Sequence, residues 1–365
     1  GLTPGSLAPF PSEGRMTSTS KSNPGHFFED FFVGMPLAHA TPQTLTEGDL
    51  ALYRALTGGR FVQYSSSEFA KAAGYPGLTI DPLHAFHVVF GKSVPDVSLN
   101  AVANLGYADG RFSQPVLPGD TLNTVSEVIG VKENSNGKTG VVWVRTRGTN
   151  QRGEEVMSFV RWVMVNKRDA NSPAPDVVIP DLPKSVPGAE LSGFASMEAW
   201  DTSLAGSEYM FEDYAVGEKI NHVDGMTVEE AEHQIATRLY QNTAKVHFDA
   251  HGQKSSRFGK RLIYGGVVIS IARSLAFNGL ANAGHMLAIN AGSHVSPLFA
   301  GDTIYAWSEV LEKAELSDKV GGLRLRLVAV KDQDPGAFAY KGEDGKYADG
   351  VLLDFDYWAA IPRKR

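Results

Sequence analysis

The chain has 365 residues, of which 42% are hydrophobic and 21% charged, which is typical of a soluble globular protein long enough for two domains. The net charge of −7, without a basic stripe, argues against a nucleic-acid partner. The absence of cysteine excludes disulfides, zinc–thiolate sites and a cysteine nucleophile. It also suits a reducing cytoplasm, where we expect the protein, and no apolar run reaches the length of a membrane span.

The first segment, residues 1–25, is rich in Gly, Pro and Ser and lacks the basic start and apolar block of a signal peptide. Its composition predicts disorder. Met16 lies within it, and we hypothesise that translation naturally starts there and that the residues before it are an artefact.

An internal repeat organises the rest of the chain. Residues 28–31 read FEDF and return as FEDY at 211–214, whereas PGDT at 118–121 returns as AGDT at 300–303. The offsets are 183 and 182 positions, in the same order, so the sequence predicts a duplicated unit. We expect the aspartate of each GDT to form a turn before a strand.

The repeat divides the chain into two similar halves. We expect an N-terminal unit over 26–168, a proline-rich linker over 169–207 that runs extended across the surface, and a C-terminal unit over 208–365.

Within each half the pattern is a strand, a polar helix start, a loop, a long apolar helix and then alternating strands. The second helix start reads as a capping box, with Thr227 as the cap and Glu230 three positions later. Long helices are predicted over 80–94 and 265–280. Each half is therefore expected to be an α+β unit, an antiparallel sheet wrapped around a long helix.

His247 is the candidate catalytic base. A lone histidine is commonly structural, but this one lies in a loop between two helical segments, where functional residues concentrate. Gly265 and Gly266 follow at a helix start, where backbone N–H groups can stabilise developing negative charge. A base beside an oxyanion donor is suited to proton chemistry next to a thioester carbonyl.

The segment YQNTAKVHFD at 240–249 resembles the active loop of the MaoC-like, R-specific enoyl-CoA hydratases, a family with the hot-dog fold. Val246, His247 and Asp249 match the family motif, and Gly265 falls where the family's thioester oxyanion donor lies. The resemblance covers both halves and implies a tandem (double) hot-dog fold.

Three positions depart from the motif. Asn242 stands where the family has its catalytic aspartate, and Ala244 and Lys245 replace an asparagine and a proline. Longer segments resemble the mesaconyl-CoA hydratase subgroup, also called β-methylmalyl-CoA dehydratases, in which asparagine at this place is typical. The first half, in the same register at 57–64, has Gly59 for the aspartate and Tyr64 for the histidine, and is expected to be catalytically inactive.

The resemblance implies a hydro-lyase that reversibly hydrates mesaconyl-CoA to β-methylmalyl-CoA, a step of the ethylmalonyl-CoA pathway. It implies no separate cofactor, because CoA is part of the substrate, and a homodimer or higher homo-oligomer. His247 would act as base and Gly265 N–H as oxyanion donor, with Asn242 orienting the water. An amide in place of a carboxylate would avoid repelling the substrate's free carboxylate.

Binding residues are also expected around the active loop. The candidates to bind substrate are Arg60, Arg238, Lys245, Asp249 and Gly266, and the first three are the candidate cationic partners of its free carboxylate. The candidates for the CoA phosphates are Arg257, Lys260 and Arg261. Each basic residue could equally be a solvated surface charge.

Two other functions remain open from the sequence. One is a hot-dog acyl-CoA thioesterase, which the absence of a carboxylate beside His247 disfavours. The other is a non-catalytic acyl-CoA-binding module, favoured by Asn242 and opposed by His247 and Gly265. His84 and His87 are three positions apart but have no third ligand nearby in sequence, so we expect core or interface positions and no metal site.

Overall fold

The structure is a computed structural model that describes residues 21–364. The hypothesised start at Met16 and most of the segment predicted to be disordered lie outside the described residues. Residues 21–25 are described and belong to no helix or strand.

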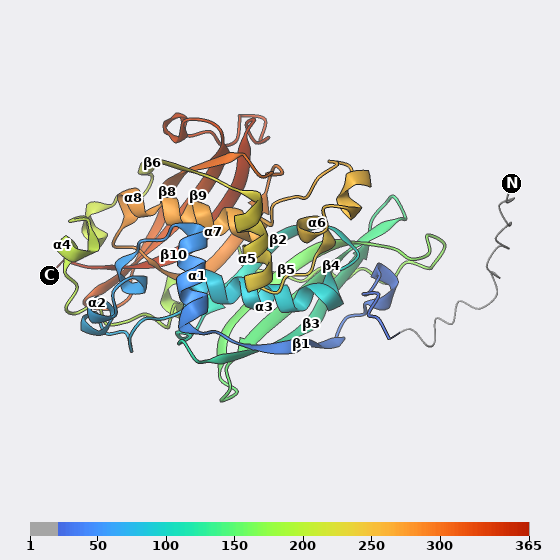
Figure 1. Ribbon diagram of the computed structural model, residues 1–365, viewed down its shortest axis with the longest axis horizontal. Helices are drawn as coiled ribbons and strands as arrows, with labels where there is room; N and C mark the ends of the chain where they lie inside the picture. Colours follow the sequence, from blue (N-terminus) through green and yellow to red (C-terminus); the bar gives the residue numbers. More distant parts are fainter. Residues whose placement is uncertain (1–20, 365) are drawn as a thin grey trace, which may run out of the picture.

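A single antiparallel sheet of ten strands forms the body of the molecule, in the order β1-β3-β4-β5-β2-β7-β10-β9-β8-β6 (Figure 1). β2 and β7 join the two halves at its centre. The strands of the first half are β1 (Pro36–Thr44), β2 (Ala101–Phe112), β3 (Thr121–Glu133), β4 (Thr139–Thr149) and β5 (Glu155–Asn166). Those of the second half are β6 (Lys219–Thr227), β7 (His285–His294), β8 (Thr303–Glu315), β9 (Val320–Lys331) and β10 (Val351–Pro362).

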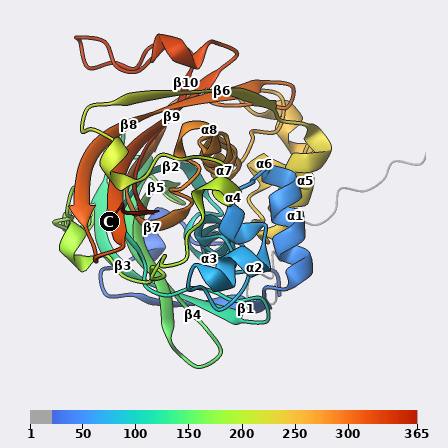
Figure 2. The ribbon, with the colours of Figure 1, turned by 90° about the vertical axis from the view of Figure 1, so that its left-hand side faces the viewer.

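The helices lie on one face of this sheet, which curves around them (Figure 2). They are α1 (Glu47–Thr57), α2 (Ser67–Ala72), α3 (Pro82–Val97), α4 (Thr202–Ala205), α5 (Glu230–Leu239), α6 (Lys245–Phe248), α7 (Gly265–Leu275) and α8 (Phe277–Leu280). Both long apolar helices were predicted, although the second is interrupted by non-helical backbone at Asn278 and Gly279. No helix among the described residues is long and apolar enough to cross a membrane.

The repeated motifs make equivalent contacts in the two halves. The Phe28 ring occupies the space that a side chain at Gly140 would need, and Phe211 does the same at Gly321. Asp30 and Asp213 each accept a hydrogen bond from the backbone three residues earlier. Since a ring that packs over a strand glycine fixes the chain on the sheet, FED is a structural motif.

The aspartates of the GDT sequences form turns, as predicted. The Asp120 carboxylate accepts from Leu117 N, and the Asp302 carboxylate accepts from Phe299 N, both at 2.9 Å. These bonds close the loop before β3 and before β8, and they occupy both aspartates away from the active loop.

The predicted capping box at Thr227 is wrong. The Thr227 hydroxyl bonds to Thr303, and α5 starts later, with Glu229 as N-cap. The first half instead carries the full box, because Thr46 accepts from Asp49 N while the Asp49 carboxylate accepts from Thr46 N. Because the Thr227 hydroxyl is hydrogen-bonded to Thr303 at the ends of β6 and β8, it does not cap α5.

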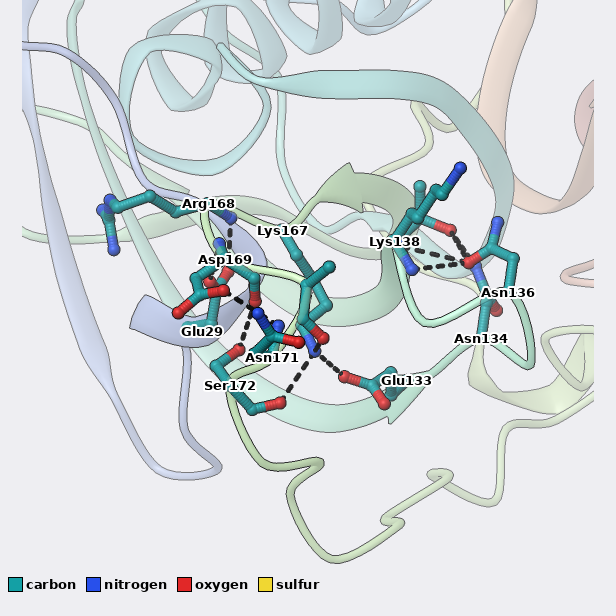
Figure 3. A network of polar contacts seen from close by, with 12 residues as sticks. Glu29, Glu133, Asn134, Asn136, Lys138, Lys167, Arg168, Asp169, Asn171 and Ser172 are labelled. Carbon is teal, nitrogen blue, oxygen red and sulfur yellow. Dashed lines mark hydrogen bonds and ion pairs between the residues drawn. The ribbon is translucent and has the colours of Figure 1, made fainter.

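The start of the linker is fixed to the first half by a polar network (Figure 3). The Glu29 carboxylate accepts from the backbone N–H groups of Arg168 and Asp169, at 2.8 and 2.7 Å. Lys167 pairs with Glu133 and donates to the carbonyl of Ser172.

Further along, the linker packs against the sheet. Val186 and Met197 are buried in a cluster with Trp358, whose indole donates to the Val186 carbonyl. Tyr357 belongs instead to the main core beside the helices. Since neighbouring strand residues point to opposite faces, the part of the linker around Val186 lies on the face of the sheet away from the long helices. The end of the linker reaches α2, because Met197 N donates to the Ala73 carbonyl, and it includes α4.

Candidate active site

The segment that follows α5 forms a short, closed loop. Asn242 is buried, its backbone N–H donates to Thr237, and its side-chain oxygen accepts from Ala244 N at 3.1 Å. This bond identifies the oxygen of the amide, so the other amide atom is the NH₂ group. That group is buried and has no hydrogen-bond partner among the described residues. The Asn242 side chain also lies beside the Tyr264 hydroxyl, whose pKa it lowers against the larger, opposite effect of burial.

His247 lies on α6, half-buried, with a defined tautomer. Its Nδ1 lies 2.9 Å from the carbonyl oxygen of Leu262, so Nδ1 carries the proton and donates. Nε2 is left with a free lone pair. Burial lowers the pKa of His247 to about 4, against the opposite effect of the Leu262 carbonyl. The imidazole is therefore neutral at physiological pH and can accept a proton.

The start of α7 lies beside this histidine. Tyr264, the residue before the helix, has its ring centroid 5.4 Å from that of His247. Its backbone N–H donates to His233 Nε2 at 2.9 Å. The N–H of Gly265 has no backbone or side-chain partner among the described residues. It is free to donate to an oxyanion, as the N-terminus of a helix favours.

Both glycines are required by the side chains around them. A Cβ on Gly265 would lie 2.5 Å from the His294 ring, and one on Gly266 would lie 2.7 Å from His87 Nδ1. The rings therefore approach the backbone of α7 as closely as glycine allows. No other residue type fits here without displacing a histidine.

Several of these residues were not predicted as part of the site. His233 lies on α5, whereas His294 of β7 contacts the Tyr107 hydroxyl of β2 at 2.9 Å. Tyr107 belongs to the first half, so the site lies where the two halves meet. Burial, with a smaller contribution from the neighbouring His247, lowers the pKa of His233 to about 3 and that of His294 to about 4. The positions of His233, His294 and Tyr107 in the sequence do not indicate that these side chains lie close together.

The first half also supports the active loop directly. A Cβ on Gly91 of α3 would lie 2.4 Å from the Tyr240 carbonyl oxygen, so α3 and the loop are in backbone contact. Lys92, buried, donates to the side-chain oxygen of Gln241 and to Thr41. Gln241 has a positive φ of 51°, and this contact fixes the side chain of a residue in an uncommon conformation.

The equivalent loop of the first half, at 57–64, has a different composition. Gly58 has a left-handed conformation and ends α1, and Tyr64 is buried. Asp81 caps α3 through a bond from Leu83 N, at the position where Tyr264 precedes α7. His84 and His87 of α3 are fully buried, which confirms the core position predicted for them.

The structure does not bring all the predicted carboxylate-binding residues together. Arg60 lies over the Phe277 ring of α8 and near Asp224, beyond the far end of α7 from Gly265. Arg238 and Lys245 are close to the loop in the chain, and both are exposed. Neither side chain forms a hydrogen bond with any of the described residues.

The remaining predicted binding residues flank the loop. Asp249 accepts from Gly252 N, which makes it a turn residue. Lys260 lies over the Phe299 ring and Arg257 over Phe258, both on the exposed surface. Arg261 pairs with Glu230 of α5. Within residues 21–364, no three metal-ligating side chains cluster closely enough to hold an ion.

Comparisons with known proteins identify the relatives of this chain. The family model for mesaconyl-CoA hydratase matches residues 14–176. The mesaconyl-CoA hydratase of Cereibacter sphaeroides is 60% identical over 94% of this chain and 100% of its own length. The β-methylmalyl-CoA dehydratase of Chloroflexus aurantiacus is 56% identical over 95% of this chain and 99% of its own.

Solved structures show the same architecture. A MaoC domain protein dehydratase from Chloroflexus aurantiacus has a TM-score of 0.93 at 56% identity, covering 95% of this chain and 100% of that one. A Mycobacterium tuberculosis protein described as a double hot dog has a TM-score of 0.74 at 25% identity, covering 93% and 99%. The predicted fold class is thereby confirmed, and the chain belongs to the mesaconyl-CoA hydratase family of MaoC-like double hot-dog proteins.

Proposed function

We propose that this protein is a hydro-lyase that reversibly adds water to mesaconyl-CoA to give β-methylmalyl-CoA. The C-terminal unit, 208–365, would carry the active loop, while the N-terminal unit, 26–168, would support it. The observation that carries the proposal is the pairing of a neutral His247, with Nε2 free, and an unpartnered N–H at the start of α7.

The chemistry follows from these two groups. Water attacks the carbon β to the thioester, and negative charge develops on the thioester oxygen. The N–H of Gly265 would donate to that oxygen, helped by the positive end of α7. His247 Nε2 would take the proton of the attacking water and then deliver it to the α-carbon on the same face. In reverse, the same nitrogen would remove the α-proton.

Asn242 would have a role that a carboxylate cannot fill. In a butenedioic acid thioester, the free carboxylate is bonded to the carbon that water attacks. The unpartnered NH₂ of Asn242 could donate to this carboxylate or to the water. An aspartate at this place would add a second negative charge in a buried site, where repulsion is strong. The cationic partner of the carboxylate is proposed to be Arg238 or Lys245, the exposed basic residues nearest the loop in the chain.

His233 would position the oxyanion donor. Its Nε2 accepts the Tyr264 N–H, which fixes the peptide preceding Gly265 and directs the next N–H into the site. The low pKa of His233 keeps this nitrogen unprotonated, as an acceptor must be. Arg257 and Lys260 are proposed to meet the CoA phosphates, because both are exposed and follow the loop.

The decisive experiment follows the absorbance of the conjugated thioester after the protein is mixed with mesaconyl-CoA. We expect the absorbance to fall to an equilibrium value with no release of free thiol, and β-methylmalyl-CoA to form. Thiol release would indicate a thioesterase instead, and an unchanged absorbance would indicate a binding module. Either result would overturn the proposal.

A further inference from the structure

A second pocket opens in the first half, at the place equivalent to the active site. It lies between α1, the start of α3 and the C-terminal part of α7, and has a cavity volume of about 30 Å³, so a ligand larger than a few waters would occupy its open mouth as well. Its polar lining comes from both halves of the molecule and includes Tyr53, Arg54, Asp81 and His84 of the first half and Ser270 and Arg273 of the second. The reaction proposed above uses none of these side chains.

Arg273 and His84, two basic residues of this pocket, have buried nitrogen atoms without a hydrogen-bond partner among the described residues. Arg273 is 3% exposed, and one of its terminal nitrogens donates to the Ala283 carbonyl. The other, Nη1, has no hydrogen-bond partner among the described residues. The guanidinium lies over the rings of Phe61 and Tyr357, at 4.4 and 5.2 Å from their centroids, and forms no ion pair with a described carboxylate. Neither ring nitrogen of His84 has a partner either. Unpaired buried polar groups are unfavourable, so such a cluster requires an explanation.

Asp81 supplies an acceptor in the same pocket. One of its oxygens accepts from Leu83 N at 2.8 Å, and the carboxylate forms no ion pair with Arg273. Burial raises the pKa of Asp81 to about 6, against the opposing effects of the Leu83 N–H and of Arg273. The pocket thus holds a cation with a free donor and, separately, a carboxyl group with acceptor capacity.

We propose that this pocket is a second ligand site that takes a short hydroxycarboxylate, with its carboxylate on Arg273 and its hydroxyl on Asp81. A carboxylate satisfies the planar donors of an arginine better than water does. A hydroxyl can donate to Asp81 and accept from His84, which a plain fatty acid cannot do. The aromatic rings of Tyr53 and Phe61 enclose the short carbon chain between them.

This site is distinct from the one that carries out hydration. Gly265 and Arg273 lie on the same helix, eight residues apart, so their Cα atoms are separated by about 12 Å. The two carboxyl carbons of a four-carbon chain are only roughly 4 Å apart, at covalent bond lengths. Asn242, His247 and Gly265 do not line the pocket, so the two sites have separate linings.

The test is calorimetric titration of the full-length protein with 3-hydroxybutyrate and with butyrate, which differ only in the hydroxyl. We expect saturable binding of 3-hydroxybutyrate that is unchanged in His247→Gln, and weaker binding of butyrate. Arg273→Gln should raise the Kd for 3-hydroxybutyrate at least about tenfold, equivalent to about 1.4 kcal/mol.

A second variant covers the case in which Arg273→Gln does not fold. Asp81→Asn retains a good helix cap and the bond from Leu83 N. It should reduce the preference for 3-hydroxybutyrate over butyrate to less than about twofold. The proposal is overturned if neither acid binds, if His247→Gln abolishes binding, or if Asp81→Asn leaves the preference unchanged.

Discussion

Replacing Asn242 by aspartate tests the role of charge in the active loop. The substitution should preserve the loop, because one carboxylate oxygen can accept from Ala244 N as the amide oxygen does. The second oxygen takes the place of the buried NH₂ group, which has no partner. The exchange therefore replaces a free donor with a negative charge and changes little else.

The expected size of the effect follows from Coulomb's law. Two unit charges separated by about 4–5 Å repel by about 3–4 kcal/mol at an effective dielectric constant of 20. Partial protonation of the new carboxyl group would relieve some of this. We therefore expect kcat/KM for mesaconyl-CoA to fall by roughly a hundredfold, since about 1.4 kcal/mol corresponds to a factor of ten.

The matched substrate is crotonyl-CoA, an enoyl-CoA that lacks the carboxylate. With it, Asn242→Asp should change kcat/KM by less than about fivefold. Asn242→Ala should affect both substrates alike if the NH₂ group donates to the water, and mesaconyl-CoA more strongly if it donates to the carboxylate. The assay is the decrease of enoyl-thioester absorbance for each pair of enzyme and substrate. A gain on mesaconyl-CoA, or an equal loss on both substrates, would refute the electrostatic explanation.

Three further predictions concern the support of the site. Gly265→Ala forces a Cβ against the His294 ring and should lower both activity and thermal stability, the latter by about 1–3 kcal/mol. Gly48→Ala on α1, where a Cβ would make only an ordinary contact with the Thr46 hydroxyl at 3.5 Å, should not lower stability, and equal melting temperatures of the two variants would contradict this. Gly91→Ala should displace the Tyr240 carbonyl and lower kcat although it lies in the first half, and wild-type kinetics would contradict that contact. His233, His247 and His294 have folded pKa values of about 3 to 4, below the unfolded value of about 6.5, so the unfolded chain binds protons first as the pH falls. Above pH 6.5 these rings are neutral in both states and the stability that they contribute is fully present. As the pH falls from 6.5 towards 4, this stability is lost and the melting temperature should decrease. A melting temperature that stays constant over this range would contradict the burial of the rings in the neutral form.

Much of the fold could be predicted from the sequence because the repeated motifs are stabilised by hydrogen bonds between residues close together in the chain. In both FED and GDT, the aspartate carboxylate accepts a hydrogen bond from the backbone N–H three residues earlier, and the same bonds occur in both halves. The long helices were evident from their apolar runs. The capping of α5 was not predictable, because Thr227 pairs with Thr303, a residue 76 positions away.

The candidate site could be predicted only in part. His247, Asn242 and Gly265 lie in two short segments with a recognisable order, and the structure places these segments side by side. Tyr107 and His294 meet only because β2 and β7 pair at the centre of the sheet. Arg60 was proposed from its place in the loop, whereas its contacts are with Phe277 and Asp224. Distances of this kind depend on tertiary packing and have no local signal.

The central claim is that one of the two equivalent loops performs the chemistry. The most direct measurement compares kcat for hydration of mesaconyl-CoA in His247→Gln and in Tyr64→Phe, the substitution at the equivalent position. We expect His247→Gln to lower kcat by at least about a hundredfold, as the loss of a general base does, with little change in KM. Tyr64→Phe should retain kcat within about threefold. Full activity in His247→Gln, or a comparable loss in Tyr64→Phe, would contradict the account.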